Sequence, residues 1–361
     1  MNNYIFTSES VSDGHPDKVA DQISDALVDA GLKNGDITTR VAVETLVTTN
    51  HVTLAGEVKN FNVSKDEVTE IVRNKVRDIG YEQDGFHWDK LKIYNEIHSQ
   101  SADIALGTDD FGAGDQGIMF GYACNQNDAY LPAPIFYAHK ILHELKLLRL
   151  QSDVLGPDAK SQVSVEYVGG NVKRIDQIVI STQHTAGNIE VARNLAKVAA
   201  FSALGDLIDK NTVWHINPTG NFVVGGPDGD AGVTGRKIIV DTYGGFAPHG
   251  GGAFSGKDPT KVDRSAAYMA RWLAKNVVAD DMADWCQIQL SYAIGVKQPT
   301  SIYVDSNGHN SSIERFIRKE IDLSPKGIID RFDLFNFTEY SKNCVYGHFG
   351  NKNVPWERIG W

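Results

Sequence analysis

Cysteine is scarce in this sequence. The 361 residues include 3 cysteines, which lie far apart in the chain at Cys124, Cys286 and Cys344. Their number is odd and no two of them have CxxC spacing, so the sequence indicates neither a disulfide framework nor a cysteine-ligated metal site. Such cysteine usage predicts a protein of the reducing cytoplasm.

Long apolar runs and positive charge are also in short supply. No stretch of 18 apolar residues occurs, and the first 17 residues contain no Lys or Arg, so neither a membrane span nor a secretory signal is predicted. The chain has 35 Lys and Arg against 46 Asp and Glu, a net charge of −11. This balance argues against a protein that binds nucleic acid or anionic membranes. Any phosphate-binding site must therefore be a local concentration of basic side chains.

What the sequence does have is length and an ordinary globular composition. At 361 residues, with 42% hydrophobic and 22% charged residues, it can bury a large interior and exceeds a typical single domain. We expect a folded protein with more than one domain.

The first third of the chain alternates between strand and helix patterns. Pro16 suits the first position of a helix, where its missing N–H would be unpaired anyway. Gly31 follows the apolar stripe of that helix and is expected to end it. Ser64 with Glu67 forms a capping box for a second helix. The predicted order is strand, helix, hairpin, helix and strand, over residues 4–11, 16–31, 41–58, 64–79 and 91–97.

The same order of elements recurs along the rest of the chain. It is predicted next over residues 117–123, 134–150, 161–181, 188–208 and 213–216. It is predicted again as a strand (237–241), a helix (262–278), two strands (286–293 and 301–304) and a helix (312–321). We therefore expect an α+β protein of three similar β-α-β-β-α-β repeats, with mixed or antiparallel sheets covered by helices. The expected domains are an N-terminal repeat (1–101), a central repeat (112–223) and a C-terminal repeat (225–361).

Two glycine patterns match nucleotide-binding fingerprints, but neither has the right context. The GxGxxG at residues 112–117 precedes a strand and opens no helix, which argues against dinucleotide binding. Residues 251–257 match the start of a P-loop, yet Asp258 stands where the metal-binding Ser or Thr belongs. Glycines still let backbone N–H groups approach an anion, and Lys257 adds a mobile positive charge. The segment is interpreted as an anion-binding loop, with a flexible surface loop as the alternative.

The residues His15-Pro16-Asp17-Lys18 place a histidine, a carboxylate and an ammonium at the start of the first helix. Free N–H groups and the helix dipole attract anions there, so a phosphate site is predicted. Asp17 is a candidate Mg²⁺ ligand, with phosphate oxygens completing the octahedron, and Asp263 is a candidate second carboxylate. The alternative is that His15 only caps the helix and Asp17 only complements its dipole.

Glu44 and Glu57 lie in the paired strands of the first hairpin. Strand alternation places both on the face opposite the apolar residues. They are expected to be solvated unless a partner or a ligand covers that face.

Longer motifs resemble those of a known enzyme family. They read FTSESVSDGHPDK, GAGDQG, DAK, HINPTG and GGGAFSGKD, and lie at residues 6–18, 112–117, 158–160, 215–220 and 250–258. In this order, from residue 4 to about residue 356, the sequence resembles methionine adenosyltransferase, also called S-adenosylmethionine synthetase. The resemblance implies a fold of three similar intertwined α+β repeats. It also implies that L-methionine and ATP are joined to form S-adenosylmethionine, and that tripolyphosphate is then hydrolysed to phosphate and pyrophosphate.

The resemblance also implies roles for individual residues. The residues implied in catalysis are His15, Asp115, Lys160 and Lys257. Those implied in ATP binding are His15, Asp158, Ala159, Lys160, Asn221, Phe222, Asp230, Arg236, Lys237, Ala253 and Lys257. Those implied in methionine binding are Glu57, Gln100, Asp230 and Lys261. By the same resemblance, two Mg²⁺ ions per site would be held by Asp17 and Asp263, and one K⁺ ion per site by Glu44.

The chemistry implied by the resemblance suits these residue types. Methionine sulfur is an uncharged nucleophile that needs no deprotonation, so an enzyme must chiefly align it with the ribose C5′ and stabilise the departing polyphosphate. The resemblance further implies a homodimer with shared active sites, which in this family is often paired into a homotetramer; the sequence does not distinguish the two assemblies. The segment from Gln100 to Asp115 is expected to act as a lid. Two alternatives are a different ATP-using enzyme that releases ADP or AMP, and a catalytically silent binding subunit.

Overall fold

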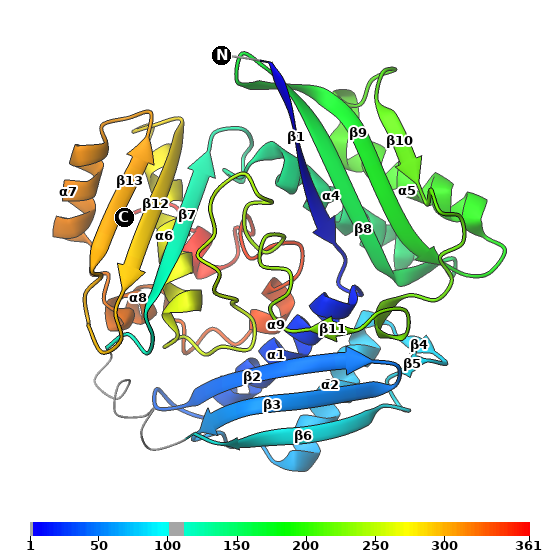
Figure 1. Cartoon of the computed structure of the whole chain (residues 1–361), viewed down its shortest axis with the longest axis horizontal. Helices are drawn as coiled ribbons and strands as arrows, with labels where there is room; N and C mark the ends of the chain where they lie inside the picture. The colour runs from blue at the N-terminus through cyan, green and yellow to red at the C-terminus, as the bar shows by residue number, and fades with distance from the viewer. Residues whose placement is uncertain (1–2, 101–111) are drawn as a thin grey trace.

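The strands form sheets that combine segments distant in the sequence (Figure 1). The computed structural model describes residues 3–100 and 112–361. Within that part of the chain, the first sheet has the order β11-β2-β3-β6, the central sheet β1-β8-β9-β10 and the third sheet β13-β12-β7. Their bounds are β1 Tyr4–Val11, β2 Arg40–Thr48, β3 His51–Lys59, β6 Lys92–Ser99, β7 Gly117–Cys124, β8 Leu155–Val168, β9 Asn171–His184, β10 Val213–Ile216, β11 Gly232–Val233, β12 Trp285–Tyr292 and β13 Ser301–Ser306. A small ribbon pairs β4 Glu82–Gln83 with β5 Phe86–His87.

Each main sheet takes one edge strand from a different repeat of the sequence. β1 pairs antiparallel with β8, from Tyr4 opposite Tyr167 to Val11 opposite Lys160. β7 pairs antiparallel with β12, and β11 pairs antiparallel with β2. The N-terminal repeat thus contributes a strand to the central sheet, the central repeat to the third sheet, and the C-terminal repeat to the first sheet. This cyclic exchange intertwines the repeats and confirms the predicted α+β fold.

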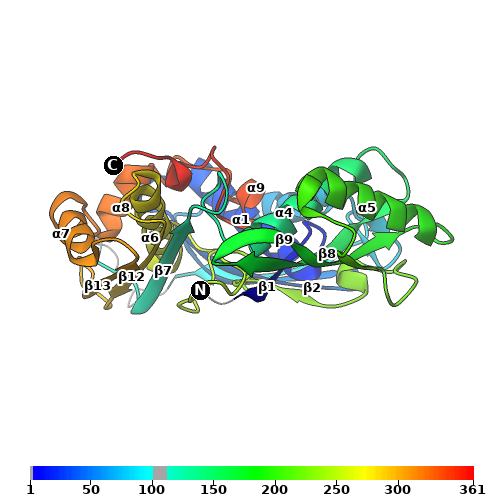
Figure 2. The same cartoon turned by 90° about the horizontal axis from the view of Figure 1, so that it is seen from above.

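The helices gather on one side of the sheets, as Figure 2 shows. Their bounds are α1 Pro16–Lys33, α2 Lys65–Ile79, α4 Ala133–Arg149, α5 Ile189–Leu204, α6 Val262–Ala279, α7 Asn310–Glu320, α8 Pro325–Phe332 and α9 Tyr340–Asn343. Short 3₁₀ turns are η1 Gly205–Leu207, η2 Gly226–Asp228 and η3 Pro355–Glu357. Among the described helices, none has both the length and the apolar composition needed to cross a bilayer.

The helix α1 has the predicted apolar stripe but does not end at the predicted residue. The apolar stripe is fully buried at Val19, Ile23 and Leu27. The prediction that Gly31 ends the helix is wrong, because α1 continues to Lys33. A Cβ atom at Gly31 would lie 2.9 Å from side-chain atoms of Phe61 and Val41. The glycine therefore permits close packing against these residues instead of terminating the helix.

The prediction of a strand over residues 237–241 is also wrong. This segment turns back on itself, with the N–H of Asp241 donating to the carbonyl of Lys237 at 2.8 Å. Val240 is buried whereas Ile239 is 42% exposed. The apolar residues of this segment therefore belong to a turn and not to a strand. The strand of this repeat that joins another sheet is instead the short β11.

The two short helices α8 and α9 near the C-terminus were not predicted. Ser324 caps α8 by accepting the N–H of Gly327 at 3.0 Å, and Pro325 occupies the first helical position. This Ser-Pro pair is a start signal that the sequence could have revealed. The other predicted elements occur with end shifts of a few residues.

The hydrophobic interior consists of two clusters of buried side chains. One cluster joins the first and third sheets with α1, α2 and α6, and the other packs α4 and α5 on the central sheet. Because α1 and α6 share a core, their N-terminal ends are fixed relative to one another. Both ends carry candidate site residues.

Candidate active site

His15 caps the N-terminus of α1 and is almost fully buried. Its backbone is extended, with φ −60° and ψ 138°, and its Nδ1 accepts the N–H of Asp17 at 3.1 Å. Burial, together with the nearby ammonium groups of Lys237 and Lys160, lowers the pKa of His15 to about 3. The imidazole is therefore neutral near pH 7, and with Nδ1 accepting, its Nε2–H remains as a donor.

Asp17 lies at the second position of α1 and is ionised. One carboxylate oxygen accepts the N–H of Val233 at 3.0 Å, and the other pairs with the ammonium of Lys237. The Nε of Arg236 is 3.5 Å from the same carboxylate. Burial alone would raise the pKa of Asp17, but the hydrogen bonds from Lys237 and Val233 outweigh it and lower the pKa.

The paired strands β1 and β8 bring further candidates to the same place. Lys160 lies opposite Val11, is exposed, and is close enough to His15 to lower its pKa. Asp158 is buried and accepts the N–H of Gly226 at 2.9 Å, while its other oxygen has no hydrogen-bond partner among the described residues. Burial raises the pKa of Asp158 to about 6, and nearby Asp230 contributes to the increase. We call His15, Asp17, Lys160, Arg236 and Lys237 the α1 cluster.

The glycine loop at residues 250–258 lies along the edge of β2. The carbonyl of Gly256 accepts the N–H of Val43 at 2.9 Å. Asp258 is fully buried, its N–H donates to the carbonyl of Val41 at 2.9 Å, and its carboxylate accepts the N–H of Val41 at 2.8 Å. The residue that departs from the P-loop pattern therefore anchors this loop to a strand. An ordinary P-loop geometry does not form.

A second group of candidates lies at the N-terminus of α6. The Nζ of Lys257 is 2.6 Å from a carboxylate oxygen of Asp263, and both side chains are partly exposed. Lys261 occupies the N-cap position of the helix without a side-chain capping bond, and its ammonium pairs with Asp258 at 2.6 Å. We call Lys257, Lys261 and Asp263 the α6 cluster. Ala253 is half-buried on the same loop.

The two clusters share one arrangement. Asp17 and Asp263 each occupy the second position of a helix, and each carboxylate pairs with one lysine from a loop, Lys237 or Lys257. Within the described residues, no group of three or more His, Cys, Asp or Glu side chains could hold a metal ion. Isolated carboxylates fit Mg²⁺ that is bound through one or two protein ligands and completed by phosphate oxygens and water. The donor set therefore suits a metal–polyphosphate complex and does not suit an all-protein metal cage.

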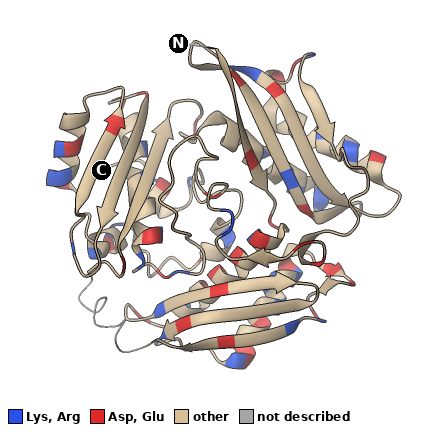
Figure 3. Ribbon diagram, viewed as in Figure 1, with Lys and Arg blue, Asp and Glu red and all other residues tan. Residues whose placement is uncertain are grey.

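Glu44 and Glu57 lie on the sheet face that no described helix covers, as strand alternation predicts. Glu44 pairs opposite Ala55 on this face, and a carboxylate oxygen of Glu57 lies 3.7 Å from the Nε2 of His98. The carboxylate of Glu44 makes no hydrogen bond or ion pair within the described part of the chain. Figure 3 shows acidic residues on the strands of this sheet. Leu46 on the same face is 42% exposed.

Gln100 directly precedes the undescribed segment 101–111, and Asp115 follows its last residue by four positions. The N–H of Gln100 donates to the carbonyl of Val58 at 2.9 Å, beside the strand that holds Glu57. Asp115 is exposed and accepts the N–H of its neighbour Gln116 at 2.7 Å. Within residues 3–100 and 112–361, no hydrogen bond or ion pair joins the side chain of Gln100 or of Asp115 to the α1 cluster or the α6 cluster. The predicted lid lies mostly outside the described residues.

Phe222 and Asn221 follow the end of the central sheet. The N–H of Phe222 donates to the Nε2 of His184 at 3.1 Å, and its carbonyl accepts the N–H of His184 at 2.9 Å. These two bonds fix the backbone of Phe222 to β9. Asn221 is exposed.

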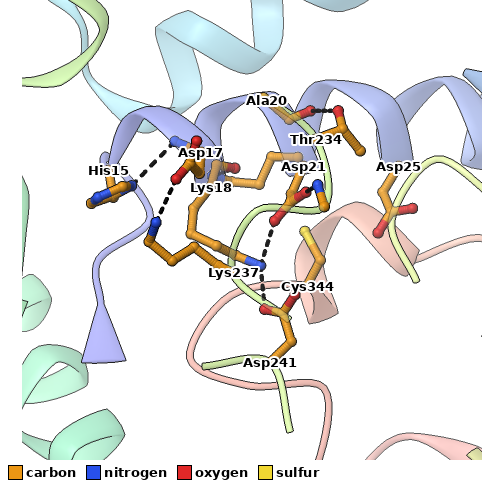
Figure 4. A network of polar contacts seen from close by, with 12 residues as sticks. His15, Asp17, Lys18, Ala20, Asp21, Asp25, Thr234, Lys237, Asp241 and Cys344 are labelled. Atoms are coloured by element: carbon orange, nitrogen blue, oxygen red, sulfur yellow. Dashed lines mark hydrogen bonds and ion pairs between the residues drawn. The ribbon is translucent and has the colours of Figure 1, made fainter. Parts of the chain in front are cut away.

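The structure also reveals polar residues near the site that the sequence analysis missed. Lys18 bridges the carboxylates of Asp21 and Asp241, at 2.8 and 2.5 Å, inside the protein (Figure 4). Asp25 pairs with the buried guanidinium of Arg264, next to Asp263. The signal available in the sequence was the spacing of aspartates at positions 17, 21, 25 and 29, which repeats every four residues and places them on one helix face.

Comparison with known protein families covers nearly the whole chain. Residues 3–102 match the N-terminal domain of S-adenosylmethionine synthetase, residues 110–222 its central domain and residues 224–358 its C-terminal domain. The chain belongs to the S-adenosylmethionine synthetase family. The resemblance inferred from the sequence motifs is thereby confirmed.

Individual members of the S-adenosylmethionine synthetase family are similar along their full length. The S-adenosylmethionine synthase of Rhodospirillum centenum is 54% identical over 375 residues, covering 99% of this chain and 96% of the relative. That of Methylorubrum extorquens is 55% identical over 378 residues, with the same coverage. That of Pelagibacter ubique is 52% identical over 380 residues, covering 99% of this chain and 97% of the relative.

Proposed function

We propose that the protein synthesises S-adenosylmethionine from L-methionine and ATP. The methionine sulfur attacks the ribose C5′, the C5′–O bond breaks, and the tripolyphosphate that leaves is hydrolysed to phosphate and pyrophosphate. The observation that carries this proposal is the pairing of a lysine with a carboxylate at the N-termini of two helices, one of which is capped by a neutral buried His15. Such an arrangement suits a long polyanion better than a single phosphate group.

The residues of the α1 cluster would stabilise the leaving group. The Nε2–H of His15 is a neutral donor that can bind the 5′ oxygen as negative charge develops there. Lys160, Arg236 and Lys237 add positive charge around it. No serine or cysteine nucleophile is needed, and all three cysteines are buried. Burial raises the pKa of each thiol, so none is poised to act as a thiolate.

Asp17 and Asp263 would each hold one of two Mg²⁺ ions per site together with polyphosphate oxygens. When bound, such ions neutralise charge on the polyphosphate. Lys237 and Lys257, which now pair with these carboxylates, would then be free to contact phosphate oxygens directly. One K⁺ ion per site would be held by Glu44, whose carboxylate is unengaged within the described residues.

The remaining candidates divide between the two substrates. Asp158, Ala159, Asn221, Phe222, Asp230 and Ala253 would contact ATP, with the ring of Phe222 stacked on the adenine. Glu57, Gln100, Asp230 and Lys261 would contact methionine. Asp115 would be a further carboxylate of the catalytic centre.

A second copy of the chain is expected to complete the site. Glu44 and Glu57 lie on a sheet face that no described helix covers, and exposed apolar side chains accompany them there at Leu46 and Tyr94. Ile118 is likewise exposed on β7 of the third sheet. A homodimer that buries these faces would enclose the acidic residues and share its active sites, and two dimers would form a homotetramer.

Product analysis tests this function. The protein is incubated with ATP, L-methionine, Mg²⁺ and K⁺, and nucleosides and phosphates are separated by chromatography. We expect S-adenosylmethionine with equal amounts of phosphate and pyrophosphate, and no turnover when methionine is omitted. Formation of ADP or AMP as the nucleoside product would favour a kinase or another synthetase, and no product at all would favour a silent binding subunit.

A further inference from the structure

One face of α1 carries a row of carboxylates that accept backbone N–H groups from the C-terminal repeat. Asp17 accepts from Val233 at 3.0 Å, Asp21 from Gly235 at 2.8 Å and Asp25 from Gly256 at 2.9 Å. The aspartates are four residues apart, so they rise about 6 Å at each step along the helix. The row therefore meets two loops that are far from α1 in the sequence.

Both loops carry lysines of the candidate site. Gly235 precedes Lys237 by two residues, and Gly256 directly precedes Lys257. The loops also touch each other, because a Cβ atom at Gly235 would lie 2.7 Å from the Cβ of Ala253. The carboxylates of Asp21 and Asp25 are thus bonded to the backbone immediately beside the two lysines.

The charge of each carboxylate is balanced inside the protein. Asp21 and Asp25 are fully buried, Lys18 pairs with Asp21, and Arg264 pairs with Asp25. Figure 4 shows Asp17, Lys18, Asp21 and Asp25 along the helix, with Lys237 and Asp241 beside the first three. A buried charged pair is costly to place, and it stabilises less than an apolar pair of the same size would. A role in fixing the loops explains its presence better than a role in stability.

Arg264 extends the contact from Asp25 to the α6 cluster. Its Nε donates to the carbonyl of Phe254 at 2.7 Å, and the residue follows Asp263 in α6. The Asp25–Arg264 pair therefore holds the glycine loop on one side and the start of α6 on the other. These are the two segments whose side chains form the Lys257–Asp263 pair.

We propose that Asp21 and Asp25 are positioning residues for the polyphosphate site, Asp21 for Lys237 and Asp25 for Lys257. Neither carboxylate touches the substrate. Each fixes a loop backbone by a charge-assisted hydrogen bond, so that the lysine ammonium meets the polyphosphate without further rearrangement. The proposal rests on the function proposed above only in taking these lysines as polyphosphate ligands.

Double-mutant cycles on the intact protein test this assignment, with inorganic tripolyphosphate as the probe and its dissociation constant measured by calorimetry. In Asp25→Asn we expect the dissociation constant to rise about tenfold, both alone and together with Lys237→Ala. Combined with Lys257→Ala, the same substitution should change it less than about twofold, because the lysine that Asp25 positions is then missing. Asp21→Asn should raise the dissociation constant both alone and together with Lys257→Ala. Its effect should be lost in the Lys237→Ala background.

Asp29→Asn is the matched control. Asp29 continues the same row on α1, but it accepts the N–H groups of Tyr340 at 2.8 Å and Ser341 at 3.0 Å, away from the lysine loops. We expect Asp29→Asn to lower the unfolding temperature and to leave tripolyphosphate affinity within about twofold of wild type.

The outcomes separate positioning from simple stabilisation. Equal effects of Asp25→Asn in all backgrounds, or an equal effect of Asp29→Asn, would overturn the proposal. If Asp25→Asn does not fold, the Asp21→Asn cycle decides it by the same criteria. A wild-type protein that binds tripolyphosphate with the expected coupling but makes no S-adenosylmethionine would overturn the proposed function and leave this inference standing.

Discussion

At the residue scale, the α1 cluster keeps a neutral histidine beside an ionised carboxylate. Burial and the charges of Lys237 and Lys160 lower the pKa of His15 to about 3, whereas hydrogen bonds from Lys237 and Val233 lower that of Asp17. The same lysine thus favours an uncharged imidazole and a charged carboxylate. Under the proposed function, a polyanion would meet a hydrogen-bond donor at His15 and a metal ligand at Asp17.

Lys257 is expected to act on the transition state more than on substrate binding. Its ammonium lies 2.6 Å from Asp263 and belongs to the loop proposed to contact the leaving group. We predict that Lys257→Ala lowers kcat on the order of 10² to 10³-fold, because one donor to a developing negative charge is lost. Steady-state kinetics should show a KM for methionine within a few-fold of wild type. An unchanged kcat with a raised KM for methionine would contradict the role, and Lys319→Ala on α7 serves as a surface control.

The buried His139 predicts a measurable pH dependence of stability. Its Nδ1 lies 2.7 Å from the Oγ of Ser10, its Nε2 has no partner among the described residues, and burial lowers its pKa to about 3. The unfolded chain therefore binds a proton at His139 near pH 6.5 while the folded protein does not, so stability is lost as the pH falls below that value.

Comparison with His139→Gln isolates this contribution from the other titrating groups. Between pH 7.5 and 5.5, the free energy of unfolding of the wild type should fall by about 1.4 kcal/mol more than that of the variant. Urea unfolding at both pH values measures the difference. Parallel pH profiles for the two proteins would show that His139 titrates normally when folded.

At the element scale, the helix starts were predictable from the sequence and the strand exchange was not. His15-Pro16-Asp17 and the approach to Asp263 carry local signals for anion-binding N-termini, and both clusters form there. The short strand β11 has two residues and no apolar alternation, so its place beside β2 depends on packing alone. That pairing brings Lys237 to Asp17, a contact across 220 positions of the chain.

The backbone conformation of the glycine loop depends on Gly256 in particular. Gly256 has φ +81°, and a Cβ atom there would lie 2.1 Å from the carbonyl oxygen of Val43. Gly251 has φ +97°, but a Cβ atom added there would have no other residue's atom within 4 Å. We predict that Gly256→Ala destabilises the protein by at least about 3 kcal/mol and weakens tripolyphosphate binding, since the backbone beside Lys257 must move.

Gly251→Ala is the matched control for this prediction. It shares the positive φ but meets no clash, so it should cost only about 1 to 2 kcal/mol of backbone strain. Thermal unfolding and calorimetry with tripolyphosphate measure both variants. Equal losses in the two variants would show that conformational strain, and not contact with β2, controls the loop.

At the scale of the whole molecule, the uncovered sheet faces point to association. Leu46 is 42% exposed on the face that carries Glu44 and Glu57. We predict that Leu46→Asp shifts the protein toward monomers in sedimentation velocity and lowers activity at least about tenfold. Val198→Asp, at a residue of α5 that is 53% exposed on the helix side, should change neither. A monomeric Leu46→Asp variant with full activity would exclude a shared active site.

The sequence predicted the repeat pattern and the residues of both clusters. It predicted less well the buried residues that hold the loops of these clusters in place. His15, Asp17, Lys257 and Asp263 stand next to local turn and cap signals. Asp25 has no turn or cap signal beside it. The four-residue spacing of the aspartates marks a helix face but not the buried partner, because Gly256 is 231 positions away and an aspartate within a helix is ordinarily solvated. Its burial follows from the packing of α1 against loops of another repeat, which no local pattern records.

The fate of a single oxygen shows which bond of ATP breaks. ATP labelled with ¹⁸O at the oxygen that bridges C5′ and the α-phosphorus is incubated with the protein, L-methionine, Mg²⁺ and K⁺. Attack of sulfur on C5′ breaks the carbon–oxygen bond, so we predict that mass spectrometry finds the label in the released phosphates and none in the nucleoside product. Label retained on the nucleoside would show cleavage between phosphorus and oxygen, and would contradict adenosyl transfer at this site.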